Sequence, residues 1–203
     1  MQHIINNVSV LYPRLNQPYR FDSGENKSVP CQWDDEGACY ETSFVMEKDE
    51  AVTLGRICKE AYKNAASMGK GKWPAEPQRL PAKTVKTDDG TTEYHGKCRI
   101  KAKYGSDKTQ QPKQVDAKRN PFPSDFRLTS GSKANIAVTV VPYNTGTESG
   151  VSLRIRAVQV TELAAEQVAA DPFSVVDGYT TDSTFVSAPA PVEDLLEDDE
   201  IPF

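Results

Sequence analysis

Positive charge stops at Arg156, and this boundary constrains the fold more than any other feature of the sequence. All 24 Lys and Arg residues lie in 1–161, whereas 11 of the 29 Asp and Glu residues lie in 162–203. Residues 1–161 therefore have a net charge of +6, although the formal net charge of the whole chain is −5. A basic body followed by an acidic segment indicates a polyanionic partner for the body.

The acidic segment changes in composition along its length. Residues 180–191 are mostly Ser, Thr, Ala and Pro, as is typical of a linker. Residues 193–200 contain six acids and too little apolar surface to offset the entropy of an ordered chain. The predicted parts are a folded body over 1–162, a linker over 163–191 that docks in part on the body through the apolar stretch 171–179, and a disordered acidic tail over 192–203.

One segment of the body has a helical pattern. In 49–68, apolar residues that include Leu54, Ile57 and Cys58 recur at helical spacing, which predicts an amphipathic helix. Asp49 is the expected N-cap, and Gly69 begins a flexible stop. Cys58 is expected to pack in the core.

The other regular segments of the body have the patterns of β-strands. They are 8–21, which leads into a Tyr-Pro turn, and 40–46, 94–104, 135–141 and 151–160. Five strands, one helix and long loops predict a mainly β fold, an OB-fold-like five-stranded antiparallel barrel. A small β-sandwich fits the same strand count.

Alternation within 94–104 places four cations on one strand face. Because like charges repel, we expect either a polyanion opposite them or a solvated face. A nucleic-acid strand is one such polyanion, and its binding needs cations for phosphates and aromatic rings on which bases stack. Trp73 lies in a loop, where we expect it to be exposed and able to stack on a base. Tyr104 is expected to pack in the core unless a bulge turns it. The predicted DNA-binding residues are Lys97, Arg99, Lys101, Lys103, Lys113, Arg154, Arg156, Trp73, Tyr94 and Tyr104.

Other features bear on cofactors and location. The cysteines at 31, 39, 58 and 98 include no Cys-x-x-Cys pair, and their spacing with His3 and His95 fits no common zinc site, so we expect free thiols and neither metal nor cofactor. No apolar run approaches the roughly 20 residues that span a bilayer. Residues 1–6 lack the pattern of a secretory signal. We therefore expect a cytoplasmic protein.

The end of the sequence carries the most specific motif. It is a run of acids followed by Ile-Pro-Phe, and it resembles the C-terminal tip of bacterial and phage single-stranded DNA-binding proteins, with Glu200 where Asp is usual. An apolar aromatic beside a carboxylate suits an apolar pocket rimmed by basic residues, and the acids add long-range attraction. The predicted partner-binding residues are Asp198, Asp199, Glu200, Ile201, Pro202 and Phe203.

The body is similar to the phage branch of that class. The similarity rests on Leu11-Tyr12-Pro13, on the strand from Tyr40 to Asp49, on 112–116 and on 150–153. It implies an OB fold with a helical insertion, in a protein that protects single-stranded DNA during phage replication or recombination in the cytoplasm of the bacterial host. The tail would then recruit a polymerase, helicase or nuclease. The sequence leaves a homodimer open.

Two other functions fit parts of the sequence. A metal-dependent nuclease could use Asp88, Asp89, Glu93, His95 and Lys97, but Asp88-Asp89-Gly90 is more typical of a hairpin turn, and no nucleophile–base pair accompanies it. The prediction is therefore that the protein is not an enzyme. A replication adaptor whose body binds protein is the other alternative, and oligonucleotide binding by the body at low salt distinguishes the two.

Overall fold

The computed structural model describes residues 1–69, 72–123 and 125–165. One compact unit spans Met1–Glu166, and a second comprises Gln167–Phe203, which lies outside the described residues. The predicted acidic tail and almost all of the predicted linker fall there, so their boundaries stay predictions.

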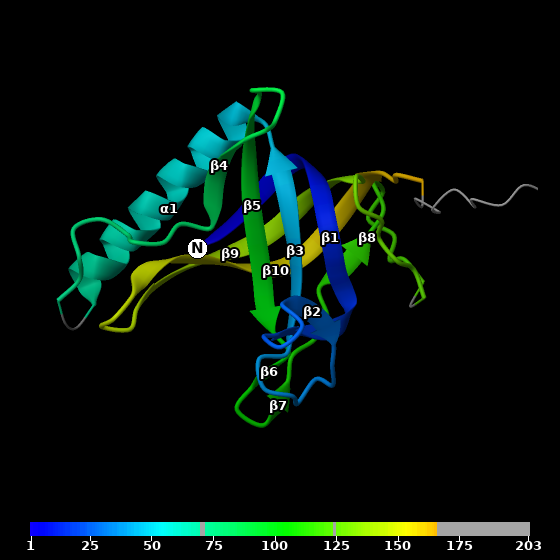
Figure 1. The fold of residues 1–203 in the computed structure, drawn as a ribbon, viewed down its shortest axis with the longest axis horizontal. Helices are drawn as coiled ribbons and strands as arrows, with labels where there is room; N and C mark the ends of the chain where they lie inside the picture. The colour runs from blue at the N-terminus through cyan, green and yellow to red at the C-terminus, as the bar shows by residue number, and fades with distance from the viewer. Residues whose placement is uncertain (70–71, 124, 166–203) are drawn as a thin grey trace, which may run out of the picture. The chain divides into compact units, whose positions relative to one another are not determined.

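The described unit is mainly β with one helix, as predicted (Figure 1). In chain order the elements are β1 (Gln2–Asp22), β2 (Lys27–Pro30), β3 (Cys39–Met46), α1 (Lys48–Met68), β4 (Ala82–Lys86), β5 (Thr92–Lys101), β6 (Lys103–Tyr104), β7 (Asp107–Lys108), β8 (Lys113–Val115), β9 (Lys133–Asn144) and β10 (Ser149–Glu162).

Eight strands form one sheet, and five long strands, β1, β3, β5, β9 and β10, are its body. The order is β4-β5-β3-β1-β9-β10-β8, with β2 on the edge of β1, while β6 and β7 form a separate hairpin. Figure 1 shows β1, β3 and β5 crossing β9 and β10. Buried side chains from both groups of strands belong to one hydrophobic core. The ladder does not close: β5 and β10 are packed together without pairing. The five long strands are antiparallel as predicted, but the added β8 runs parallel to β10.

A strap of four residues, 78–81, joins the two sides of this open seam. The amide of Arg79 donates to the carbonyl of Ser149 (3.1 Å), and the amide of Val151 donates to the carbonyl of Arg79 (3.0 Å). On the other side, the amide of Lys97 donates to the carbonyl of Pro81 (3.0 Å). Main-chain hydrogen bonds therefore hold β5 and β10 at a fixed separation at this end of the barrel.

The core forms because alternate side chains of the long strands point inward. Fully buried strand residues include Ile5, Val10, Phe44, Ile136 and Ile155. Helix α1 adds Leu54, Ile57, Cys58 and Tyr62, so the predicted packing role of Cys58 is confirmed. Within the described part of the chain, no helix is long and apolar enough to cross a membrane.

Two local predictions were wrong. The N-cap of α1 is Glu47, whose side chain makes no capping hydrogen bond, while Asp49 lies in the first turn, where its charge favours the helix dipole. The Tyr-Pro turn does not end the first strand: β1 continues through Pro13 because a register shift between Leu11 and Arg14 absorbs the extra residues. Tyr12 takes a φ of 48° at this bulge.

Gly150 tests whether the strap controls stability. A Cβ at this position would lie 2.4 Å from the carbonyl oxygen of Arg79, so Gly150→Ala must displace the strap or β10. We expect the free energy of unfolding to fall by about 1–3 kcal/mol, as for an overpacked core. The matched control is Gly55→Ala in α1, where nothing lies within 4 Å of the added Cβ, and which should raise stability by roughly 0.5–1 kcal/mol. Urea unfolding measures both, and an unchanged Gly150→Ala protein would contradict the strap's role.

Candidate nucleic-acid interface

The outer face of β5 carries exposed cations, as its alternation predicts. Lys97, Arg99 and Lys101 are exposed, while Cys98 between the first two and Gly96 just before them are buried. Gly96 lies against the ring of Phe44, where an added Cβ would meet a ring carbon at 2.3 Å, and this contact fixes which face of β5 points inward. The cations therefore point away from the core.

A groove of about 700 Å³ runs along the open seam between β5 and β10. β5 contributes Lys97, Arg99 and Lys101, β10 contributes Ser152 and Arg154, and the strap forms one end. Arg79 of the strap makes an ion pair with Glu148 there (2.6 Å). The complete lining is Arg79, Leu80, Pro81, Lys97, Arg99, Lys101, Tyr104, Val141, Tyr143, Thr145, Glu148, Val151, Ser152, Leu153 and Arg154.

A second hollow, of about 520 Å³, continues from the groove across the end of β5. Arg99 and Lys101 line both hollows. The second is also lined by Lys103, Gly105 and residues 35–39, which include Asp35 and Glu36 of the loop before β3. The cationic surface is therefore continuous past the end of β5, with an acidic loop at its far side.

Lys103 and Tyr104 are not part of the β5 face, which corrects the prediction of one four-cation strand. β5 ends at Lys101, and the chain turns where the amide of Ala102 donates to the carbonyl of Ala38 (2.9 Å). Lys103 then donates from Nζ to the carbonyl of Asp34. Tyr104 is 42% exposed rather than packed in the core, and its ring lies 5.3 Å from the guanidinium carbon of Arg154. The turn thus brings an aromatic ring to the groove.

Two other predicted aromatic residues lie elsewhere. Trp73 is half-buried against the core, with its ring edge-on to Tyr62 at a centroid distance of 5.2 Å, so the expectation of an exposed loop tryptophan was wrong. Tyr94 lines an apolar hollow of about 240 Å³ between α1 and β4. The structure does not bring either ring to the groove, and their contact with DNA stays a prediction.

Of the remaining predicted cations, Arg154 and Arg156 are both exposed on β10, whereas Leu153 and Ile155 are buried. This is the predicted alternation. Arg154 lines the groove, and Arg156 lies two residues further along the strand. Lys113 is exposed on β8 and lines a different hollow, which it shares with Phe122.

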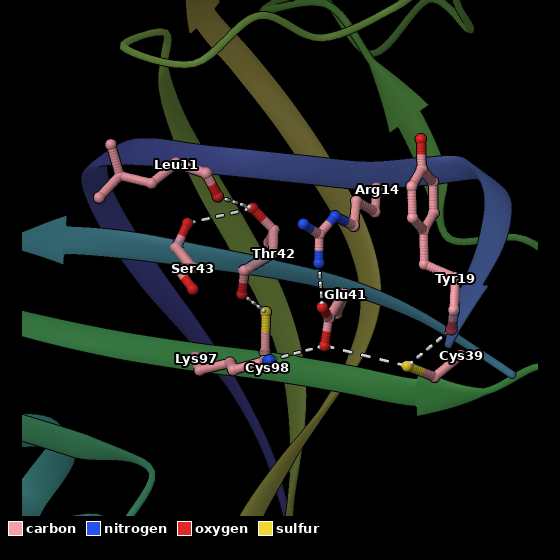
Figure 2. A network of polar contacts seen from close by, with 9 residues as sticks. All are labelled: Leu11, Arg14, Tyr19, Cys39, Glu41, Thr42, Ser43, Lys97 and Cys98. Carbon is pink, nitrogen blue, oxygen red and sulfur yellow. Dashed lines mark hydrogen bonds and ion pairs between the residues drawn. The ribbon is translucent and has the colours of Figure 1, made fainter. Parts of the chain in front are cut away.

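A buried carboxylate lies within the cationic face, and the sequence analysis missed it. Figure 2 shows Glu41 of β3 between Arg14 of β1 and Lys97 of β5. Arg14 Nη1 lies 2.6 Å from Glu41 Oε1, and Lys97 Nζ lies 2.7 Å from Oε2. Cys39 Sγ is 3.9 Å from the same Oε2. The sequence did contain a sign of this network: Glu41 is an acid inside the predicted strand 40–46, and a charge that is buried in a strand needs a partner of opposite charge.

Opposing effects set the ionisation of Glu41. Burial raises its pKa, but hydrogen bonds and charges from Lys97 and then Arg14 outweigh burial and hold the pKa below its ordinary value. The neighbouring Cys39 thiol has a raised pKa because of burial and of the Glu41 charge. Glu41 is thus a carboxylate at neutral pH, and it offsets part of the positive charge on this face.

The residues considered for a nuclease have structural roles. Asp89 accepts hydrogen bonds from Thr87 and Thr91 in the turn before β5, and these bonds lower its pKa to about 2. His95 Nε2 lies 2.6 Å from Glu93 Oε2. Among residues 1–69, 72–123 and 125–165, no group of three His, Cys, Asp or Glu side chains is placed to hold a metal ion.

The chain is similar in sequence to known proteins. The family model described as "Enterobacter phage Enc34, ssDNA-binding protein" matches residues 1–184. The single-stranded DNA-binding protein of Escherichia phage T7 is 28% identical over 188 residues, which cover 86% of this chain and 76% of that protein.

Solved structures show the same fold. The bacteriophage Enc34 single-stranded DNA-binding protein in complex with ssDNA has a TM-score of 0.56 at 15% identity, over 81% of this chain and 88% of that one. The crystal structure of the bacteriophage T7 single-stranded DNA-binding protein has a TM-score of 0.55 at 17% identity, over 85% and 98%.

The pH dependence of stability tests the Glu41 network. Because the folded-state pKa of Glu41 lies below that of the unfolded chain, its contribution is present above the ordinary glutamate pKa of about 4.3 and is lost as the pH falls through the lowered value. We expect Glu41→Gln to reduce the free energy of unfolding by about 1–3 kcal/mol at neutral pH. The difference from wild type should shrink in acid. A deficit that stays constant down to the acid limit of folding would contradict the charged network.

Proposed function

The chain belongs to the family of the Enterobacter phage Enc34 ssDNA-binding protein, and we propose that it binds and protects single-stranded DNA without sequence preference during phage replication or recombination. The observation that carries this proposal is the cationic groove between β5 and β10. It combines Lys97, Arg99, Lys101 and Arg154 with an exposed aromatic ring.

The groove's chemistry suits a single strand. Exposed Arg99 and Lys101 can contact successive phosphates, which every sequence shares. Tyr104 can stack on a base, and every base has a π-face. The guanidinium of Arg154 over the Tyr104 ring adds a cation beside this aromatic surface. Phosphate contact and stacking need no reading of base edges, which supports binding without sequence preference.

The matched family and relatives are described as DNA-binding proteins, which supports the prediction that the chain is not an enzyme. Action in the cytoplasm of a bacterial host follows from the phage origin of these relatives and is part of the proposal. A homodimer stays open, as in the sequence analysis.

We also propose that residues 192–203 recruit replication or recombination proteins. Six acids in 193–200 precede Ile201-Pro202-Phe203. This combination suits an apolar pocket with a basic rim on a polymerase, helicase or nuclease. The acids can also compete with DNA for the basic body, because their attachment to the same chain gives them a high effective concentration near it.

Removing two groove cations tests the DNA-binding proposal. The double variant Arg99→Ala/Lys101→Ala should bind oligothymidine and mixed-sequence strands more weakly, by a similar factor. The plot of log K against log salt should flatten by about 0.7 for each phosphate that the variant no longer neutralises. Fluorescence anisotropy at several salt concentrations measures both quantities.

The matched control is Lys86→Ala/Lys118→Ala, which removes the same charge from exposed positions outside the groove. It should change the slope little. If the two double variants behave alike, the groove is not the DNA site. If the wild-type protein does not bind oligonucleotide at low salt, the body is an adaptor instead.

Two tail variants separate competition from recruitment. Deleting residues 192–203 should raise affinity for single-stranded DNA, most at low salt, and abolish partner recruitment, because it removes both the acids and the apolar anchor. Phe203→Ala should abolish recruitment and leave DNA affinity nearly unchanged. Anisotropy measures affinity, and pull-down of a replication partner measures recruitment. If the protein without residues 192–203 binds DNA no better than the full chain at low salt, the tail does not compete with DNA and serves only in recruitment.

A further inference from the structure

The outward cations of β5 do not have equal surroundings. Lys97 Nζ lies 2.7 Å from a carboxylate oxygen of Glu41. In the described ranges, the ion pairs include neither Arg99 nor Lys101. All three cations alternate along β5 and are exposed, and the strand register places Arg99 opposite Glu41. The carboxylate nevertheless bonds Lys97, as the side chains in Figure 2 show.

We propose that Glu41 is a positioning residue of the DNA-binding groove: as an internal counter-ion, it holds Lys97 and Arg14 and reduces the charge that Lys97 presents to DNA. Arg99 and Lys101 are then the β5 residues that neutralise phosphates. This inference rests on the proposed binding of single-stranded DNA in the groove, and it predicts which cations contribute to affinity.

Burial explains why Glu41 keeps its place while Lys97 can respond to DNA. The Glu41 side chain is 9% exposed, whereas that of Lys97 is 53% exposed. A phosphate can therefore approach the ammonium group but not the carboxylate. Even when Lys97 leans toward a phosphate, the negative charge of Glu41 stays beside it. Arg14, Glu41 and Lys97 together carry one net positive charge, and Arg14 lines neither hollow, so Lys97 adds less charge to the groove than Arg99 or Lys101 does.

The second oxygen of Glu41 is already used by Arg14. Arg14 Nη1 lies 2.6 Å from Oε1, and the Arg14 side chain is 26% exposed. The guanidinium carbon also lies 5.0 Å from the centroid of the Tyr19 ring. Glu41 thus holds Arg14 beside an aromatic ring on β1 and Lys97 beside β3, and Arg14 lines neither hollow of the proposed DNA-binding surface.

Salt dependence distinguishes this role from a purely structural one. Each phosphate that the protein neutralises contributes about 0.7 to the slope of log K against log salt for single strands. Lys97→Ala should flatten the slope by much less than Arg99→Ala, because Lys97 is already balanced. Glu41→Gln removes the balancing charge, so it should raise affinity at low salt and steepen the slope by up to about 0.7.

A double-mutant cycle on the full-length chain gives the decisive test. The variants are Lys97→Ala, Glu41→Gln and their combination, with Arg99→Ala for comparison, titrated against oligothymidine at several salt concentrations. As a single substitution, Lys97→Ala should change the slope little. In the Glu41→Gln background, it should flatten the slope by about 0.7, the amount for one phosphate contact. Glu93→Gln, which removes the same charge from the start of β5 outside the groove lining, should leave the slope unchanged.

Equal slope changes for Lys97→Ala and Arg99→Ala in the wild-type background would overturn the inference and leave the proposed function standing. This comparison does not need Glu41→Gln to fold. An unchanged slope in folded Glu41→Gln would also overturn it. If wild-type binding has no salt dependence, the proposed function and this inference both fall.

Discussion

The main-chain hydrogen bonds of the strap 78–81 hold together an otherwise open seam. β5 and β10 form no ladder with each other, so no regular pairing fixes their distance. The strap bonds to Ser149 and Val151 on one side and to Lys97 on the other. A ladder at this seam would have brought the strands to about 4.8 Å and removed the groove. The groove therefore exists because the seam is bridged at one end and left unpaired along the rest.

Charge placement follows from this architecture. A strand whose inner face is filled by the core has only its outer face available for charged residues, and β5 places three cations there. Their mutual repulsion is tolerable in water, where it is screened. β3 reduces it further with one buried carboxylate, whose own burial is offset because two cations bond it. The basic surface and the acid within it thus belong to one arrangement across three strands.

Local periodicity explains what could be predicted from the sequence. The helix over 49–68, the outward cations from Lys97 to Lys101 and the outward Arg154 follow from spacings of a few residues, and the structure shows each in place. Interactions between distant segments explain the misses. Trp73 packs on Tyr62 only because the loop folds back on α1. β5 ends early because Ala102 bonds to Ala38, and this turn exposes Tyr104. The role of Glu41 depends on side-chain contacts across three strands: the register places it opposite Arg14 and Arg99, but its carboxylate bonds Arg14 and Lys97, which a single sequence does not give.

The edge strand β4 has a consequence for crowding. It is five residues long, follows Pro81 and carries exposed Lys83 and Lys86. Short, lysine-bearing edges resist pairing with the edge of another molecule. Proteins that coat a long polymer are held side by side at high local density, where an open sheet edge would promote aggregation. With β4 at this margin, the sheet is kept from extending there into the sheet of a crowded neighbour.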